Sequence, residues 1–396
     1  MRVPVSEKYY DQKEIDAAIK ALYVGRWTAG DECDTFKGKI SSYTGAKHVT
    51  LVNSGSSANL IALDACRHAF GWKPGDEIIT CALGFPTTLN PIIQLGLIPK
   101  FVDSKGLNID PDKIEEAITE KTVGIMIAHT LGFPFDVKKI KAICDMHGLK
   151  LISDSCDAFG TELKDGTRTV MAGTEGVVGT VSFYPAHHIN SIEGGAVYTN
   201  NTKVGFIANA LTQWGRGSCY CKTAENNACG KRFKWKTKNM PWGHDHKYIF
   251  HYAGYNLKMS DIHAAIGNVQ IDRVQWFKQK RRENYEYYSK HIKLKHEPLR
   301  KGVNPFGFVI YKKDALKAIE KLSKYDIDAR LVFAGNLTRQ PYLERYFYPS
   351  QFPEADRIMK ECFWIGVQPG LTEEQREYVV DIINTKIAGK KLNQYV

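Results

Sequence analysis

The sequence predicts an α/β fold with a large domain on a mainly parallel sheet and a smaller α/β domain at the C-terminal end. With 396 residues, the chain is longer than a single hydrophobic core usually supports. Short apolar runs alternate with amphipathic stretches through the first half, a pattern typical of parallel strands covered by helices. We therefore expect a large domain over residues 1–265, with an irregular insertion at 215–255, and a small domain over 266–396.

The composition is that of a soluble globular protein with an excess of basic residues. Hydrophobic residues make up 43% of the chain and charged residues 24%, which is ordinary for a soluble globular protein. No apolar run reaches the ~20 residues that span a bilayer, and the charged start has no signal-peptide pattern, so we expect a cytoplasmic protein. The net charge of +11 suits an anionic partner such as a nucleic acid, a membrane surface, a nucleotide-linked substrate or an acidic protein.

The elements follow one another in a regular order. Residues 12–45 predict helices with a break at Trp27–Gly30. Strands are then predicted at 47–52, 77–82, 99–102, 123–129 and 150–154, and helices at 53–70, 87–95, 111–118 and 137–147. A strand–loop–strand unit at 181–198, a helix at 203–214 and long helices at 260–295 complete the pattern. Ligands bind beyond the carboxyl ends of such strands, where Ser54–Ser57, Phe85, His129 and Asp154 fall.

The segment Asn53–Asn59 has the composition of a phosphate-binding turn. Its Gly55 and Ser56 come between a strand and a helix, where free backbone N–H groups and the helix dipole favour an anion. The alternative is a simple helix cap by a serine or asparagine side chain. The turn alone does not decide between the two.

Several motifs together resemble a known family. The stretch 181–198 reads VSFYPAHHINSIEGGAVY, and the stretch 129–136 reads HTLGFPFD. They resemble the patterns S-F-[FY]-x-x-K followed by G-E-G-G, and H-x-x-G-x-P-x-D, of the sugar aminotransferase and dehydratase family (DegT/DnrJ/EryC1/StrS). The resemblance implies an aspartate-aminotransferase fold and a pyridoxal-type cofactor. Ser191–Ile192 replaces the glycine usual before Glu193.

The resemblance also implies the residues that hold the cofactor. Gly55, Ser56 and Ser182 match positions on the cofactor phosphate, and Phe85 matches the aromatic residue over the ring. A buried phenylalanine of the core is the alternative interpretation of Phe85.

A carboxylate is implied at the cofactor ring nitrogen. Asp154 and Asp157 lie in SDSCDA, which resembles the family motif D-x-[AC]-[QHD]-A, and Asp154 would keep the ring nitrogen protonated. A helix cap or a surface salt bridge would be the alternative role of Asp154. Asn256 in YNLKMS matches the asparagine that reaches the cofactor phosphate of a neighbouring subunit, which implies a homodimer.

His187 stands where the family's aminotransferases have the lysine that binds pyridoxal phosphate, and no lysine lies between Lys164 and Lys203. Imidazole is not a primary amine and cannot form that Schiff base. The histidine resembles the family's 3-dehydratases of nucleotide-linked 4-keto-6-deoxyhexoses, on the route to 3,6-dideoxy sugars. These use pyridoxamine phosphate, and His187 would be the base, because imidazole transfers protons near neutral pH. His188 either assists or packs in the loop.

Four cysteines form a candidate metal site. Cys219, Cys221 and Cys229 give C-x-C-x₇-C on a polar segment, and Cys156 lies two residues after Asp154. Four thiolates fit a [2Fe–2S] cluster or zinc, and free buried thiols are the remaining alternative. The quartet resembles the iron–sulfur branch of the family, in which a flavin and iron–sulfur reductase supplies electrons. Packed thiols are expected at Cys33, Cys66, Cys81, Cys144 and Cys362.

Residues 231–238, KRFKWKTK, are basic with interleaved aromatic residues. Such a run suits single-stranded nucleic acid or a solvated surface, and we favour a docking site for the acidic reductase, with neither nucleic acid nor a membrane as partner.

The sequence thus favours a reductive 3-dehydratase. The alternatives are a cluster-free dehydratase that restores its amine cofactor from glutamate, and a non-enzymatic metal-binding or nucleic-acid-binding regulator on the same fold.

Overall fold

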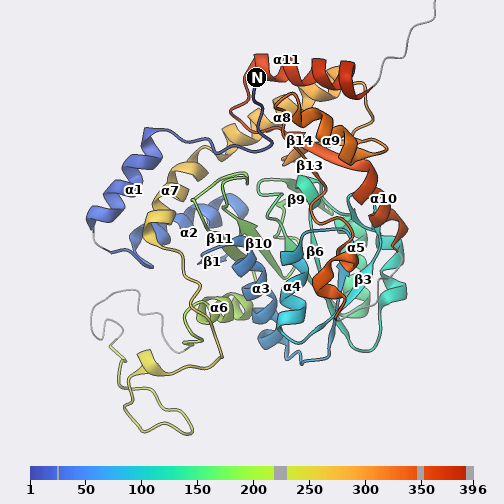
Figure 1. The fold of residues 1–396 in the computed structure, drawn as a ribbon. Helices are drawn as coiled ribbons and strands as arrows, with labels where there is room; N and C mark the ends of the chain where they lie inside the picture. Colours follow the sequence, from blue (N-terminus) through green and yellow to red (C-terminus); the bar gives the residue numbers. More distant parts are fainter. Residues whose placement is uncertain (25, 218–229, 346–351, 389–396) are drawn as a thin grey trace, which may run out of the picture.

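The computed structural model describes residues 1–24, 26–217, 230–345 and 352–388 (Figure 1). A seven-stranded sheet in the order β1-β11-β10-β7-β6-β2-β3 forms the centre of the large domain. Its strands are β1 (His48–Val52), β2 (Glu77–Cys81), β3 (Ile98–Val102), β6 (Thr122–Ala128), β7 (Lys150–Asp154), β10 (Val178–Ser182) and β11 (Gly195–Thr199). The strands from β10 to β3 run parallel, whereas β11 pairs antiparallel with both β1 and β10. The predicted mainly parallel sheet is confirmed.

Helices cover both faces of this sheet (Figure 1). One face packs on α3 (Gly55–Phe70), α4 (Pro86–Gln94) and α6 (Thr202–Leu211). The other packs on α5 (Val137–His147), α2 (Asp31–Thr44) and α7 (Asp261–Asp272). Neighbouring strand residues serve opposite faces: Ile78 lies in the core under α3, and Ile79 in the core under α5. This explains why the strands read as continuous apolar runs.

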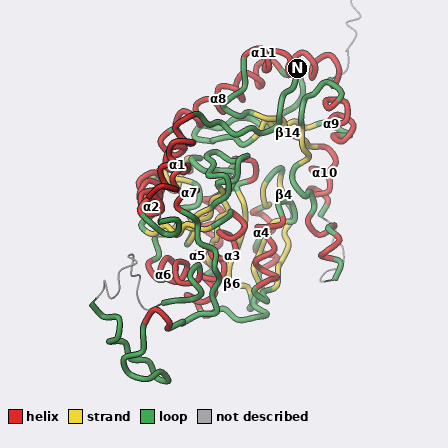
Figure 2. Tube along the Cα trace, turned by 60° about the vertical axis from the view of Figure 1, so that its left-hand side comes forward, coloured by secondary structure: helices red, strands yellow, loops and turns green. Residues whose placement is uncertain are grey.

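The small domain is built on a three-stranded antiparallel sheet. Its order is β12 (Gly307–Tyr311), β14 (Cys362–Gly366) and β13 (Ala329–Leu331), with β14 in the middle. The helices α9 (Ala315–Ser323), α10 (Pro353–Glu361) and α11 (Glu373–Ile382) surround it, and α8 (Val274–His291) leads into it (Figure 2). The amino-terminal Val3 also pairs with this domain, at Ile327.

Most predicted boundaries agree with the structure to within a few residues. The break at Trp27–Gly30 separates α1 (Gln12–Val24) from α2, and the long helical stretch divides into α7 and α8 at Arg273. The predicted division of domains at residues 265 and 266 falls inside α7 and stays a prediction.

Two local predictions differ from the structure. The single helix expected at 111–118 is instead two short 3₁₀ turns, Pro111–Lys113 and Glu115–Ala117. A hairpin of β8 (Glu162–Asp165) and β9 (Arg168–Met171) is not among the predicted elements. Its turn carries the Asp-Gly signal of a tight hairpin, with Gly166 at φ 61°.

A short backbone ladder joins the two domains. The N–H of Gly84 donates to Gly335 O (3.3 Å), and the N–H of Ala334 donates back to Gly84 O (3.2 Å). The N–H of Leu337 donates to Ala82 O at 2.8 Å. This interdomain ladder (residues 82–84 with 334–337) places the segment after β13 directly beside the turn before α4.

Among the helices that the structure describes, none has an apolar stretch long enough to cross a membrane.

Candidate active site

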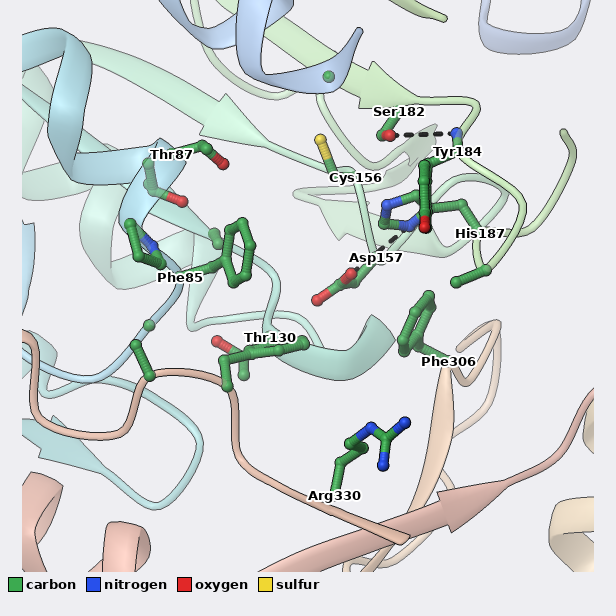
Figure 3. Close-up of a pocket in the computed structure, with 18 of the residues that line it drawn as sticks. Phe85, Thr87, Thr130, Cys156, Asp157, Ser182, Tyr184, His187, Phe306 and Arg330 are labelled. Atoms are coloured by element: carbon green, nitrogen blue, oxygen red, sulfur yellow. Dashed lines mark hydrogen bonds and ion pairs between the residues drawn. The ribbon is translucent and has the colours of Figure 1, made fainter. Parts of the chain in front are cut away.

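A cavity of about 1140 Å³ lies between the carboxyl edge of the large sheet and the small domain. The turns after β1, β2, β7 and β10 line one side, and β13 with the segment after it lines the other. Figure 3 shows side chains from both domains pointing into it. The cavity lies at the strand ends where the sequence predicts a ligand site, and the binding of a ligand there stays a prediction.

The turn before α3 forms one end of the cavity. Ser54 caps α3 by accepting a hydrogen bond from Ser57 N (3.1 Å), while Gly55 and Ser56 line the cavity. A Cβ at Gly55 would lie 2.5 Å from Ser182 Cβ, so only glycine permits this close approach. First-turn N–H groups of a helix have no intrahelical acceptor. The helix cap and the predicted anion site are thus compatible. Ser182 also lines the cavity, and the binding of a phosphate by Gly55, Ser56 and Ser182, called the cradle below, stays a prediction.

Asp154 is fixed at the end of β7 by three donors. Its Oδ2 accepts from Asn59 Nδ2 (2.8 Å) and Thr88 Oγ1 (2.7 Å), and its Oδ1 accepts from Cys156 N (3.1 Å). The side chain is 5% exposed and lines the cavity. This arrangement excludes the surface salt bridge that was the alternative role, and it leaves a buried negative group facing the cavity.

His187 and Asp157 lie side by side at the cavity wall, and a dashed line joins their side chains in Figure 3. His187 Nδ1 lies 3.7 Å from Asp157 Oδ1, beyond hydrogen-bond distance, and has no hydrogen-bond partner in the described part of the chain. Burial lowers the pKa of His187 to about 4. Burial, together with the charge of Asp154, raises the pKa of Asp157 to about 8. At pH 7 the imidazole is therefore a neutral base, and Asp157 is mostly protonated.

The backbone around His187 is held by residues that the sequence motifs did not indicate. Arg281 of α8 is 3% exposed, and its guanidinium donates to His187 O (3.2 Å) and Phe306 O (3.3 Å). The Phe306 ring lies 5.3 Å from the His187 ring. His188 is buried, and its Nε2 contacts Asn304 O at 3.1 Å, so this second histidine packs in the loop.

Phe85 is not a core residue. It precedes α4, is 50% exposed and lines the cavity. Its ring meets Phe333 edge-on, with a centroid distance of 5.9 Å. Phe333 follows β13 and directly precedes the interdomain ladder, so the aromatic wall of the cavity is built by both domains.

Two residues of the family-like motifs lie away from the cavity, of which only Asn256 is a predicted site residue; the sequence supports no catalytic role for His129. His129 is fully buried and contacts Glu175 Oε1 (2.9 Å), while its neighbour Thr130 lines the cavity instead. Asn256 is not among the residues that line the cavity, and its Oδ1 accepts from Lys258 Nζ (2.8 Å). A role for Asn256 therefore requires a different chain's cavity and stays a prediction.

The four-cysteine site can be described only in part. Cys156 lines the cavity, and burial with the nearby charge of Asp154 raises the pKa of its thiol. Cys219, Cys221 and Cys229 lie outside the described residues. Within the described residues, no group of three or more His, Cys, Asp or Glu side chains could hold a metal ion. The five cysteines expected to be packed thiols are buried.

The basic segment includes an ion pair. Arg232 Nη2 lies 2.6 Å from Asp245 Oδ2, whereas Lys234, Lys236 and Lys238 are exposed. The docking role of residues 231–238 stays a prediction.

The loop between His187 and Glu193 is strained at Ile192. This residue has φ 67°, in the left-handed region that β-branched residues avoid, and is 52% exposed. It occupies the position where the resemblance leads one to expect glycine. Glu193, which follows directly, lines the cavity, so the strain sits at the cavity rim.

Comparison with known proteins agrees with this geometry. A model described as the DegT/DnrJ/EryC1/StrS aminotransferase family matches residues 8–384. The chain is 43% identical to the lipopolysaccharide biosynthesis protein RfbH of Salmonella typhimurium, covering 96% of this chain and 90% of that protein. It is 39% identical to dTDP-4-dehydro-2,6-dideoxy-D-glucose 3-dehydratase of Saccharopolyspora spinosa, covering 96% and 85%.

Solved structures of an aminotransferase fold superpose on nearly the whole chain. Escherichia coli GDP-4-keto-6-deoxy-D-mannose-3-dehydratase with bound hydrated PLP gives a TM-score of 0.81 at 26% identity, covering 96% of this chain and 99% of that one. The same kind of enzyme with a trapped PLP-glutamate geminal diamine gives 0.84 at 26% identity, covering 96% and 100%. The predicted aspartate-aminotransferase fold is confirmed.

Replacing Ile192 by glycine should raise the free energy of unfolding by about 1 kcal/mol, because glycine adopts positive φ without the steric cost. Ile192→Ala is the matched control, since it removes the same exposed side chain but keeps the Cβ that causes the strain. Denaturant unfolding of the cofactor-free protein measures both. Equal effects of the two substitutions would contradict the assignment of strain to the backbone.

Proposed function

Because the chain belongs to the DegT/DnrJ/EryC1/StrS aminotransferase family, we propose that it is a 3-dehydratase of a nucleotide-linked 4-keto-6-deoxy sugar. The cofactor is pyridoxal phosphate in its pyridoxamine form, and the product belongs to the 3,6-dideoxy sugars. The observation that carries the proposal is His187, whose side chain is 16% exposed and lines the cavity at the position where a transaminase needs a lysine. Relatives named as 3-dehydratases support it.

The residues present fit such a cofactor. The cradle of Gly55, Ser56 and Ser182 suits a phosphate, because a glycine at the helix start leaves room for the anion beside the hydroxyl. Asp154 would bind the ring nitrogen, and its three hydrogen bonds prevent it from turning away. Phe85 supplies an exposed aromatic face. Its edge-on contact with Phe333 keeps that ring in place at the cavity.

When bound, the cofactor supplies an amine for the C4 ketone and an aromatic ring that withdraws electrons. The negative charge of Asp154 keeps the ring nitrogen protonated, which increases that withdrawal. His187, neutral at pH 7, accepts a proton at its imidazole nitrogen and lies next to a protonated Asp157. Phe306 and Arg281 keep the imidazole in one place while the proton moves.

Replacing His187 by asparagine should lower kcat by ~10²- to 10⁴-fold, the usual contribution of a positioned base. In the wild-type enzyme, the rate at pH 5 should stay within about twofold of that at pH 7, since a base with a pKa near 4 is still neutral there. An unperturbed imidazole would be only roughly 3% neutral at pH 5. Steady-state pH–rate profiles check both effects.

His147→Asn is the control for this substitution, because His147 lies on the surface beside Glu115 and should leave the rate unchanged. An acid limb centred near pH 6.5 in the wild type would contradict the burial effect on His187.

We further propose that Cys156, Cys219, Cys221 and Cys229 bind a [2Fe–2S] cluster, which supplies electrons one at a time from a flavin and iron–sulfur reductase. Two features support this: the C-x-C-x₇-C spacing, and the position of Cys156 in the cavity next to Asp154. Cluster binding requires thiolates, so the metal would have to displace the proton that the partly buried Cys156 otherwise keeps.

Anaerobically purified protein should contain about two irons and two acid-labile sulfides per chain, with an electron paramagnetic resonance signal after reduction. Cys156→Ser and Cys219→Ser should lose the signal, whereas Cys144→Ala, on the buried face of α5, should keep it. Turnover should require an added electron carrier.

Zinc in place of iron would retain the dehydration and remove the electron transfer. Protein without metal that turns over with glutamate would instead support the cluster-free dehydratase, which the structure with trapped PLP-glutamate favours as the second candidate.

The proposed assembly is a homodimer with shared cavities. Asn256 supports a dimer. It matches the asparagine that reaches the cofactor of a neighbouring subunit in the family, and it does not line the cavity of its own chain. Sedimentation at the mass of one chain would contradict the dimer. We also propose a cytoplasmic location, since the described cysteines are all free thiols, as in a reducing compartment.

A further inference from the structure

Three carboxyl side chains line the cavity, but only one arginine or lysine does so among the residues that the structure describes. Asp154, Asp157 and Glu193 line it from the large domain. Arg330 of β13 is the one lysine or arginine among the lining residues that the structure describes. Asp157 is mostly protonated at pH 7, but Asp154 and Glu193 would repel a ligand with a negatively charged diphosphate unless a cation within the cavity bound it.

The backbone of Arg330 is held in the sheet, whereas its side chain has few polar contacts. Its backbone pairs with Trp364 of the central strand β14, and Trp364 Nε1 donates to the neighbouring Leu331 O at 3.2 Å. The guanidinium makes one long hydrogen bond, from Nη1 to Ala329 O at 3.4 Å. It forms no ion pair with any carboxylate in the described ranges. The backbone is therefore fixed while the planar donor group remains available.

Arg330 and the cradle at α3 occupy opposite sides of the cavity. Figure 3 shows Ser182 on one side and Arg330 on the other, with Asp157 and His187 between them. One cofactor phosphate cannot bind at both places. The cradle fits that phosphate, so the guanidinium is left for a second anion, carried by the ligand that reacts near His187.

The rim beside Arg330 is apolar. Leu316 and Ile319 of α9 line this part of the cavity, and Leu316 is 56% exposed. A cation next to an exposed apolar surface suits a ligand that joins an oxyanion to a less polar group.

We propose that Arg330 forms a second oxyanion-binding subsite, which binds the phosphate or carboxylate group of the ligand that reacts at His187. Both groups present oxygen pairs that match the guanidinium fork. The inference rests on the proposed function, which offers two sources of such a group. One is the diphosphate of the nucleotide-linked substrate, and the other is the carboxylate of an amino donor in the cluster-free reaction.

Isothermal titration of the holoenzyme tests the subsite. The probes are the nucleoside diphosphates CDP, GDP and dTDP, inorganic pyrophosphate, and L-glutamate. Arg330→Gln should raise the Kd of the bound probe by about tenfold to a hundredfold, the usual loss for a charged hydrogen-bond donor. Arg330→Lys should recover part of this loss, because it keeps the charge without the fork.

Lys317→Gln is the matched control. Lys317 lies on the same helix as Leu316, its side chain is 79% exposed, and it does not line the cavity. This control also removes one positive charge from the small domain. If both substitutions raised the Kd equally, the anion would be attracted by the overall charge and not bound by Arg330, which would overturn the subsite.

The outcomes separate the two sources and the two proposals. A loss confined to the nucleotides and pyrophosphate supports the subsite for the diphosphate, and a loss confined to glutamate supports it for the carboxylate. Unchanged binding of all probes to Arg330→Gln overturns the subsite and leaves the dehydratase standing. A wild-type holoenzyme that binds none of the probes overturns both proposals.

Discussion

The buried carboxylate of Asp154 is the constraint on which the cavity depends. Its hydrogen bonds reach Asn59 on α3 and Thr88 on α4, and Asn59 in turn accepts from Thr180 on β10. One charge thus ties two helices and two strands to a common point. Burial raises the pKa values of Asp157 and Cys156, and the charge of Asp154 raises them further. Removing this charge would therefore change both the architecture of the cavity and the protonation of its neighbours.

Local patterns were sufficient for the large domain and for its side of the cavity. Strand and helix periodicity gave the parallel sheet, and short motifs gave Ser182, Asp154, Phe85 and His187, all of which line the cavity. A motif fixes residues that lie close in sequence: Ser182 and Asp154 end their strands, and Phe85 and His187 lie in the turns that follow β2 and β10. His129 shows the limit of the argument, because a strand-end position does not say whether a side chain turns outward or, as here, into the core.

The other side of the cavity could not be predicted in this way. Arg281, Phe306, Arg330 and Phe333 come from the last third of the chain and meet the motif residues only through long-range packing. None belongs to a motif, and an arginine in an amphipathic helix or edge strand reads as surface charge. Arg281 is instead buried, where it binds backbone carbonyls, a role that sequence spacing does not specify.

The interdomain ladder affects how the cavity between the two domains could open. Its three backbone hydrogen bonds join the domains along one edge of the cavity, beside Phe85 and Phe333. Spreading the domains at that edge would break all three bonds at once, whereas the rim at Leu316 and Ile319 carries no such ladder among the described contacts. If the cavity opens, we therefore expect the apolar rim to move while the edge with the ladder stays in place. Substrate and product would then enter and leave the cavity on the same side.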